Sequence, residues 1–170
     1  RPLRVVFVGN VTPRKGLKTL IEGLSAAETD VKLTVVGRSA DERYAAAVRR
    51  SVRREGLADR VDLAGELSEE ELETVLRSSH VLAVPSRYEG FGIVYLEGMS
   101  FGLPAIASRA GGATDVVTDG ETGVLVDPGN SAAIAGALTR FDADRDRLAS
   151  MGKAARRRYE SHPDWRETTA

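Results

Sequence analysis

Near the start of the chain stands LRVVFVG at residues 3–9, a β-branched apolar run that a glycine closes. Such a run is typical of a strand that is buried on both faces of a sheet. Residues 15–27 follow, with apolar side chains every three or four positions from Leu17 to Leu24. This is the spacing of one helix face. A strand followed by a helix predicts the first unit of a parallel sheet.

The same alternation continues along the chain. Further strands are predicted over residues 31–37, 60–65, 80–85, 104–107 and 123–126, and further helices over residues 41–55, from 68 onward, 92–101, 131–138 and 145–159. The pattern predicts an α/β fold, a Rossmann-like three-layer parallel sheet with right-handed crossovers and helices on both faces. We expect one domain over residues 1–160 and a C-terminal tail over residues 161–170 that carries Trp165.

Composition excludes several classes of function. The 170 residues hold 24 basic and 25 acidic side chains, for a formal net charge of -1, and this balance argues against a nucleic-acid binder. The chain has no cysteine, which excludes disulfides, thiolate nucleophiles and thiolate zinc sites. Its 2 histidines make a histidine-rich metal site a poor hypothesis. No apolar run approaches the ~20 residues that span a bilayer.

Ligands of such sheets bind outside the carboxyl ends of the strands, so the residues after each strand carry the functional information. The first strand is followed by Gly9, Asn10, Arg14 and Lys15. A glycine-ended strand, two adjacent cations and a helix start can all face one phosphate. The alternative is a solvated basic turn. The loop has neither the phosphate-binding Gly-x4-Gly-Lys-Ser/Thr pattern nor the dinucleotide Gly-x-Gly-x-x-Gly fingerprint.

The fourth strand is followed by PSRYEGFGIVYLE at residues 85–97. Gly90 and Gly92 allow the backbone to lie close to a ligand, and the helix start after them offers free N–H groups to an anion. Glu97 lies about a turn and a half into that helix, where its carboxylate can accept both hydroxyls of a ribose. Glu89 lies in the loop. Together these residues suggest a nucleotide joined to a polyhydroxyl group, although two surface glutamates around a glycine turn remain the alternative.

The residues at the other strand ends are weaker indicators of function. Gly111 and Gly112 form either a second close-approach loop or a plain turn, and residues 118–123 are predicted to be a structural turn into the last strand. His80 begins an apolar strand, where a satisfied core histidine is the expected reading. His162 lies in the predicted tail.

In this order, the motifs resemble the C-terminal domain of a GT-B glycosyltransferase of family 4, the group 1 glycosyltransferases. The most specific element is Glu-x7-Glu, here Glu89 to Glu97. Supporting elements are Val-Gly-x4-Arg-Lys-Gly near the start, GLPAIA at residues 102–107, the Gly111-Gly112 pair, and DGETG at residues 119–123 followed by Asp127-Pro128. The resemblance covers residues 3–159, nearly the whole chain.

The resemblance implies a role for each matched position. Lys15 would contact the pyrophosphate of a nucleotide-diphosphate sugar, and Glu97 would hold the ribose hydroxyls. Glu89 would face the transferred sugar as the catalytic candidate. Backbone groups would line the hydroxyls and phosphate, from Gly90, Phe91, Gly92, Ile93 and Val94. The base is placed around Gly37-Arg38 and residues 65–67.

The family also implies transfer with retention of configuration, by same-face attack in which the leaving phosphate takes the acceptor's proton. No obligatory metal or other cofactor is expected, because cationic side chains and a helix dipole can stabilise the leaving diphosphate. Many members have arginine where this chain has Asn10, so the positive charge is expected from Lys15 with help from Arg14. Asp115 stands where glutamate is common, and we expect the shorter side chain to be tolerated.

The resemblance extends only to the donor-binding half, so the N-terminal acceptor domain is expected to be absent from this chain and to be its partner. We expect the chain alone to bind donor weakly, to transfer no sugar and to self-associate through the apolar surface that the other half covers. A cytoplasmic location is expected, with any peripheral membrane association a property of the other half.

Three other functions are alternatives to a glycosyltransferase half. A nucleotide-sugar 2-epimerase shares the GT-B fold, but the Glu-x7-Glu motif argues against it. A stand-alone module that senses nucleotide sugars without transferring them is a different class, and a partner domain encoded ahead of Arg1 would distinguish the two. A Rossmann dehydrogenase lacks its glycine fingerprint here. The sequence does not identify the donor sugar, the base or the acceptor.

Overall fold

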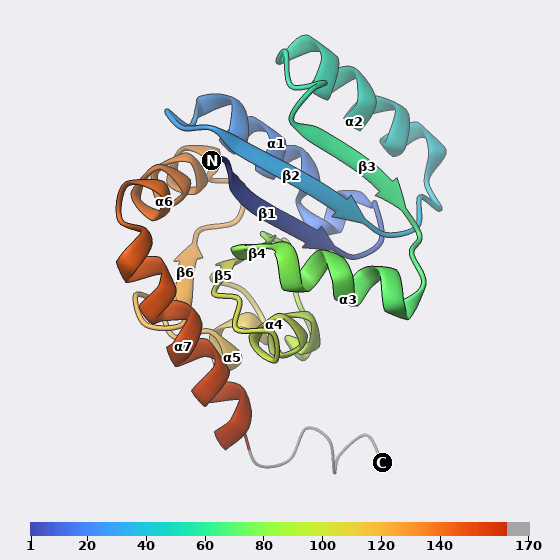
Figure 1. The fold of residues 1–170 in the computed structure, drawn as a ribbon. Helices are drawn as coiled ribbons and strands as arrows, with labels where there is room; N and C mark the ends of the chain where they lie inside the picture. The colour runs from blue at the N-terminus through green and yellow to red at the C-terminus, as the bar shows by residue number, and fades with distance from the viewer. Residues whose placement is uncertain (163–170) are drawn as a thin grey trace.

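The computed structural model describes residues 1–162. It contains a parallel six-stranded sheet with the strand order β3-β2-β1-β4-β5-β6 (Figure 1). The strands are β1 (Leu3–Val8), β2 (Val31–Val36), β3 (Val61–Gly65), β4 (Val81–Val84), β5 (Ala105–Ser108) and β6 (Gly123–Val126). The predicted α/β parallel fold is confirmed.

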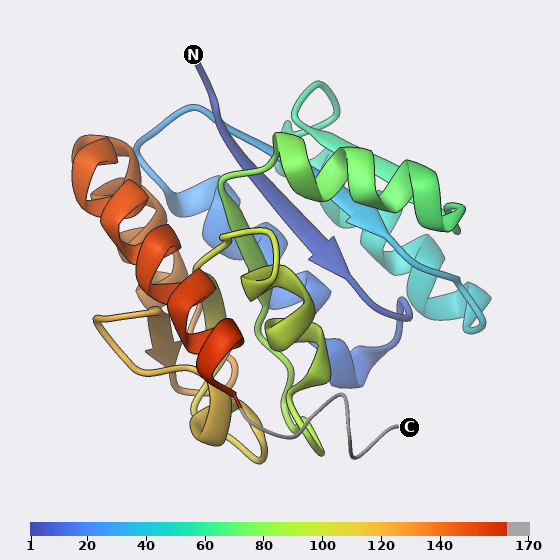
Figure 2. The ribbon, with the colours of Figure 1, turned by 60° about the horizontal axis from the view of Figure 1, so that its bottom comes forward.

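Helices cover both faces of the sheet. They are the 3-10 helix η1 (Pro13–Lys15) and the α-helices α1 (Leu17–Ala26), α2 (Glu42–Arg54), α3 (Glu69–Ser78), α4 (Ile93–Met99), α5 (Ala113–Val116), α6 (Ser131–Ala143) and α7 (Arg145–Ser161). In Figure 2, α3, α4 and α7 lie in front of the sheet, while α1 and α2 lie behind it. Helix α6 packs against α1.

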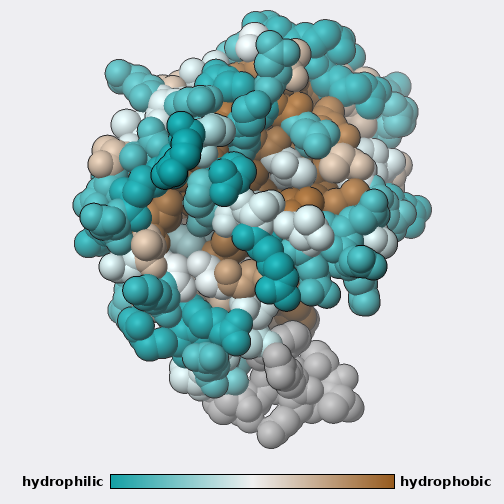
Figure 3. Space-filling model, viewed as in Figure 1, coloured by the Kyte–Doolittle hydropathy of each residue, from teal (hydrophilic) through white to brown (hydrophobic). Residues whose placement is uncertain are grey.

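The central strands form the core. Every residue of β4 and β5 is buried, which explains why both read as unbroken apolar runs. Strand β3 lies at the edge and is more open, with Leu63 40% exposed. In Figure 3, apolar residues show between the hydrophilic helices in the upper half of the view, where β1 to β3 lie.

Local signals set several element ends. The Ser68 hydroxyl accepts the backbone N–H of Glu71 at 3.1 Å, and the Glu71 carboxylate accepts the backbone N–H of Ser68 at 2.9 Å. The capping box expected from their spacing is therefore confirmed. The predicted turn over residues 118–123 is confirmed as well. There, Thr122 Oγ1 accepts the N–H of Thr118 at 2.9 Å, and Asp119 Oδ1 accepts that of Leu125 at 3.0 Å.

Four expectations were wrong in detail. The helix expected over residues 15–27 is split, because Gly16 adopts a left-handed conformation between η1 and α1. Residues 113–116, for which no helix was expected, form α5. Helix α6 continues to Ala143, since Phe141 extends the buried face by one more turn. Helix α7 ends at Ser161, inside the predicted tail; Trp165 and the rest of that tail lie outside the described residues.

Within residues 1–162, no helix is both long and apolar enough to cross a membrane.

Candidate functional site

The strand order reverses between β1 and β4, and ligands of open parallel sheets bind at the carboxyl edge beside such a point. Both loops carry predicted site residues, and hydrogen bonds to backbone carbonyls hold the two loops together. The N–H of Arg87 donates to the carbonyl of Arg14 at 2.8 Å, and Arg14 Nη1 donates to the carbonyl of Tyr88 at 3.0 Å. The topology therefore brings the first two predicted motifs into one site.

The centre of this site is an ion pair between Lys15 and Glu89. Lys15 Nζ lies 3.2 Å from each carboxylate oxygen of Glu89, and each side chain is only 13% exposed. Ser86, which is buried, donates its hydroxyl to Glu89 Oε2 at 2.8 Å. The Glu89 carboxylate is thus held from two sides. Because an ammonium has three N–H donors, Lys15 keeps one for a further acceptor.

Two glycines lie against the segment that carries Lys15. A Cβ built on Gly9 would lie 3.6 Å from the Lys15 side chain, so the lysine stem passes close over the end of β1. Gly16 has φ +77°, and a Cβ there would lie 2.1 Å from the carbonyl oxygen of Pro85. The loop after β1 therefore packs directly against the end of β4.

Arg14 makes a contact that the sequence did not predict. We expected it to assist Lys15 with positive charge. Its guanidinium donates to the Tyr88 carbonyl and ties the two loops together, and its assistance to Lys15 stays a prediction. Asn10 is exposed. Of the predicted cations, Lys15 is the one that the structure places against a candidate site carboxylate.

The glycine loop after β4 is supported by the double glycine after β5. The N–H of Gly112 donates to the carbonyl of Glu89 at 2.5 Å, and a Cβ on Gly111 would lie 2.2 Å from that same oxygen. The Gly111-Gly112 pair was predicted to allow a close backbone approach, and the backbone that it approaches is that of Glu89. Gly92, at φ +69°, starts α4 with no side-chain cap. Gly90 and Phe91 in this loop are exposed, as is Ile93 in the first turn of α4, whereas Val94 is half-buried.

Glu97 lies on α4, as predicted. Its carboxylate makes no hydrogen bond or ion pair with another side chain in the part of the chain that the structure describes, so it is free to accept a ligand's hydroxyls. Glu97 is exposed by surface area, yet the surrounding protein desolvates the carboxyl group and raises its pKa above the usual value. Fixed hydroxyl donors would stabilise the charged form.

A hollow lies near the carboxyl ends of β2 and β3, where the base was predicted. Its volume is about 230 Å³, and it is lined by Val11, Val35, Gly37, Ser39, Ala45, Val48, Arg49, Leu63 and Gly65. A Cβ on Gly37 would lie 1.7 Å from the carbonyl oxygen of Gly9, so the ends of β1 and β2 meet at this hollow. Arg38, Glu66 and Leu67, also named for the base, are not among its lining residues. No group of three or more side chains suited to a metal occurs in residues 1–162.

His80 lies at the other end of β4, away from this site. Its Nδ1 accepts the backbone N–H of Arg4 at 2.9 Å, which confirms the reading of a satisfied structural histidine. Burial lowers the pKa of His80, and the nearby guanidinium groups of Arg4 and Arg145 lower it further.

This pKa shift predicts a loss of stability in mild acid. The unfolded chain takes up a proton below about pH 6.5, where folded His80 stays neutral. The contribution of neutral His80 to the free energy of unfolding is therefore fully present above that pH. It is lost as pH falls through the folded pKa, by about 1.4 kcal/mol for each unit by which folding lowers the pKa. Urea unfolding at pH 7.5 and 5.5 should show a larger loss for the unaltered protein than for His80→Asn, which keeps an acceptor for Arg4 but does not titrate. Equal losses would contradict the assignment.

Comparisons with known proteins agree with the geometry. A family model described as "Glycosyl transferases group 1" matches residues 1–158. The chain is 35% identical to a GDP-mannose-dependent alpha-(1-6)-phosphatidylinositol monomannoside mannosyltransferase of Mycolicibacterium smegmatis, over 98% of this chain and 45% of the relative. It is 34% identical to a D-inositol 3-phosphate glycosyltransferase of Xylanimonas cellulosilytica, over 98% of this chain and 40% of the relative. The chain thus spans less than half the length of these curated relatives.

Solved structures show the same relation. Anabaena HepE in complex with UDP-glucose superposes with a TM-score of 0.89 at 26% identity, over 94% of this chain and 44% of that one. Sucrose-phosphate synthase of Thermosynechococcus elongatus superposes with a TM-score of 0.88 at 35% identity, over 98% of this chain and 42% of that one.

Proposed function

The chain belongs to the group 1 glycosyltransferases, and from this membership we propose that it is the donor-binding half of such an enzyme. It holds a nucleotide-diphosphate sugar at the carboxyl edge of the sheet. In the full-length protein a hexose-type sugar passes, with retention of configuration as in family 4, to an acceptor on an N-terminal domain. The observation that carries this proposal is the Lys15–Glu89 pair between the two loops at the point where the strand order reverses.

Each side chain has a chemical task in this proposal. The free N–H of Lys15 binds the diphosphate, and its charge stabilises the leaving group without a metal. Glu89, held by Lys15 and Ser86, faces the transferred sugar. Glu97 accepts the two ribose hydroxyls, and the backbone of residues 90–94 lines the phosphate and sugar. The base lies in the hollow at the ends of β2 and β3. UDP-glucose in the HepE complex supports a nucleotide-sugar donor without fixing the base used here.

Exposed apolar side chains next to the site support a second domain. Phe91 is 82% exposed, Tyr88 58% and Ile93 46%, and all three lie in the loop after β4 or at the start of α4. Apolar groups gathered at a binding site are usually covered by a partner surface. We propose that an N-terminal domain covers them in the full-length protein, and that copies of the chain alone associate there. A cytoplasmic location stays a prediction of the family resemblance.

Thermal unfolding with UDP, GDP, ADP and their hexose conjugates tests the donor site. A nucleotide present at 100 times its Kd stabilises the folded chain by about 2.7 kcal/mol, and each 1 kcal/mol shifts the Tm of a protein of this size by about 2–4 °C. We expect one nucleotide series to give such a shift. Glu97→Gln should weaken that nucleotide about tenfold or more, because a hydrogen bond to a charged group contributes about 1.5–3 kcal/mol.

The matched control is Glu70→Gln, an exposed carboxylate in the first turn of α3 on the same protein. It should leave nucleotide binding unchanged. If Glu97→Gln binds the nucleotide as tightly as the unaltered chain, the ribose assignment fails. The competing function is a sensing module that binds the donor without transferring sugar. To distinguish it from a transferase half, the chain is joined to the N-terminal acceptor domain of a relative and assayed for sugar transfer. Donor binding without transfer would favour the module.

A further inference from the structure

Two buried hydroxyl groups lie near the carboxylate of Glu89, and the proposed chemistry uses only one of them. Ser86 is buried and donates to Glu89 Oε2 at 2.8 Å. Tyr95 lies in the first turn of α4 and is fully buried. Its hydroxyl donates to the carbonyl oxygen of Val84, the last residue of β4, at 2.6 Å. A buried tyrosine hydroxyl usually has such a partner, and here the partner is the end of the strand that precedes Ser86.

The bond between Tyr95 and Val84 closes the base of the donor loop, which we define as residues 85–92 between β4 and α4. The backbone N–H of Tyr95 donates to the carbonyl of Gly92 at 3.1 Å. Tyr95 therefore contacts the last residue of the loop through its backbone and the residue before the loop through its hydroxyl. Without that hydroxyl, the start of the loop, which carries Ser86, loses a tie to α4.

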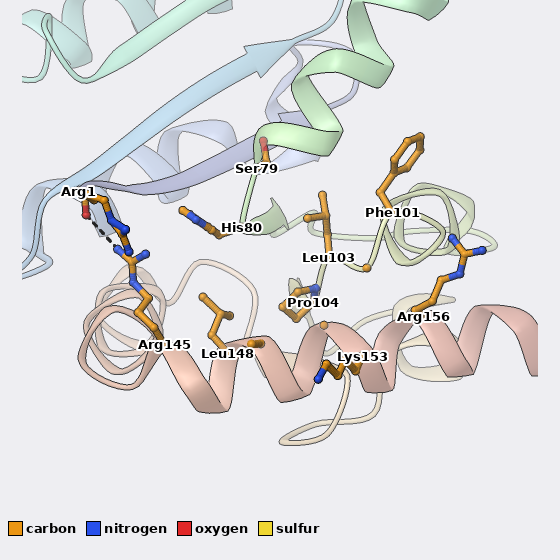
Figure 4. A pocket seen from close by; sticks show the side chains of 13 residues that line it. Arg1, Ser79, His80, Phe101, Leu103, Pro104, Arg145, Leu148, Lys153 and Arg156 are labelled. Carbon is orange, nitrogen blue, oxygen red and sulfur yellow. Dashed lines mark hydrogen bonds between the residues drawn. The ribbon is translucent and has the colours of Figure 1, made fainter.

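The opposite end of β4 is fixed independently. His80 directly precedes the strand, where its Nδ1 accepts the N–H of Arg4 at 2.9 Å and its own N–H donates to the Arg4 carbonyl at 2.8 Å. Figure 4 draws the pocket beside this end of β4, with His80 on the side toward Arg1 and Arg145. Every residue of β4 is buried. The strand is thus a firm support, and the placement of the donor loop on it depends on contacts at the carboxyl end.

The side chains of Tyr95, Ser86 and Glu89 also affect one another electrostatically. Burial raises the pKa of Tyr95, and the negative charge of Glu89 raises it further, whereas a hydrogen bond with the Ser86 side chain lowers it. The phenol therefore stays protonated at neutral pH and remains a donor. The two hydroxyls and the carboxylate form one connected group.

The contacts of Glu89 leave one acceptor position for a sugar. An ionised carboxylate offers about four lone-pair positions. Lys15 Nζ lies 3.2 Å from each oxygen, and Ser86 takes a second position on Oε2. The Glu89 backbone is held as well, because its carbonyl accepts the N–H of Gly112 at 2.5 Å. The position that remains is on Oε1, and the rotation of the carboxylate sets its direction.

We propose that Ser86 and Tyr95 are positioning residues for the transferred sugar. Ser86 fixes the rotation of the Glu89 carboxylate, and Tyr95 fixes Ser86 by holding the start of the donor loop on β4. This inference rests on the proposed function, in which Glu89 faces the sugar. The two hydroxyls therefore act on the affinity for the sugar part of the donor. The nucleoside diphosphate, held by Lys15 and Glu97, is affected much less.

Isothermal titration of the 170-residue chain tests the proposal with UDP and UDP-glucose, GDP and GDP-mannose, and ADP and ADP-glucose. For whichever pair binds, the measured quantity is the affinity for the nucleotide sugar divided by the affinity for the nucleoside diphosphate. Ser86→Ala should lower this ratio about tenfold, the effect of a charge-assisted hydrogen bond that is no longer aimed at the sugar. Tyr95→Phe should lower it about threefold or more. The double variant should lose no more than Ser86→Ala alone, because Tyr95 acts through Ser86.

Ser51→Ala and Tyr159→Phe are the matched controls. Ser51 is a buried serine of α2 and Tyr159 a buried tyrosine of α7, so each variant removes the same hydroxyl from a buried position outside the donor loop. Either control can lower the Tm. Both should leave the affinity ratio within about twofold of the unaltered chain, since distant sites act independently. The ratio thus separates positioning from a merely structural role.

Circular dichroism first establishes which variants are folded. Tyr95→Phe keeps the buried ring, and titration at about 15 °C is near the temperature at which most domains are most stable. If Tyr95→Phe is still unfolded, Ser86→Ala decides, because the proposal requires its effect. An unchanged ratio in a folded Ser86→Ala or Tyr95→Phe chain overturns the proposal, as do additive losses in the double variant or an equal loss in a control. The proposed function fails separately, if no nucleoside diphosphate binds or if Glu97→Gln leaves its affinity unchanged, and this inference then falls with it.

Discussion

Lys15→Ala is expected to weaken binding of the nucleoside diphosphate about 100-fold. In the proposed site its ammonium donates to both oxygens of Glu89 and keeps one N–H for the diphosphate. Without it, the phosphate charge meets the Glu89 carboxylate with no cation between them. A charged hydrogen bond of about 1.5–3 kcal/mol is lost, and a repulsion replaces it. Isothermal titration with whichever of UDP, GDP and ADP binds the unaltered chain measures the effect.

Lys32→Ala is the control for this experiment. Lys32 is an exposed lysine on β2, and its loss changes the net charge equally. It should leave nucleotide affinity unchanged. Since Lys15 and Glu89 are each only 13% exposed, Lys15→Ala also leaves a poorly solvated carboxylate without its partner, so circular dichroism must first show that the variant is folded. A folded Lys15→Ala chain with unaltered affinity would remove Lys15 from the donor site.

The fold was predictable because its signals are local. The mostly apolar runs of β1, β4 and β5 follow from burial of most of their residues. The strand–helix alternation leaves few topologies. The elements missed, α5 and the last turn and a half of α6, depend on tertiary packing. Phe141, for example, extends α6 because it is buried against the core, and sequence spacing alone does not show that a core lies there.

The site was predictable in its composition but not in its internal contacts. Lys15, Glu89 and Glu97 were named because their residue types suit a nucleotide sugar at strand ends. The bond from Ser86 to Glu89 joins residues only three apart, but the orientation of both side chains depends on the loop. The bond from Arg14 to the Tyr88 carbonyl could not be predicted, because sequence does not say which way a guanidinium points.

Gly16→Ala is expected to destabilise the chain by about 3–5 kcal/mol, which is the range of the more severe single substitutions. Two costs combine. At φ +77° an alanine is strained by about 1–2 kcal/mol. In addition, its Cβ would lie 2.1 Å from the oxygen and 2.8 Å from the carbon of the Pro85 carbonyl, and backbone cannot rotate away as a side chain can. Thermal unfolding should show a Tm lowered by about 10 °C or more.

Gly56→Ala separates these two costs. Gly56 has nearly the same φ, +70°, but a Cβ there meets nothing within 4 Å. Its substitution should therefore cost only the conformational strain, about 1–2 kcal/mol. Equal losses for the two variants would show that the contact with Pro85 carries no energy. If Gly16→Ala loses more, as we expect, the loops after β1 and β4 are packed as one unit. Because Pro85 directly precedes Ser86, which holds Glu89, the shift that an alanine forces would also reach the carboxylate of the donor site.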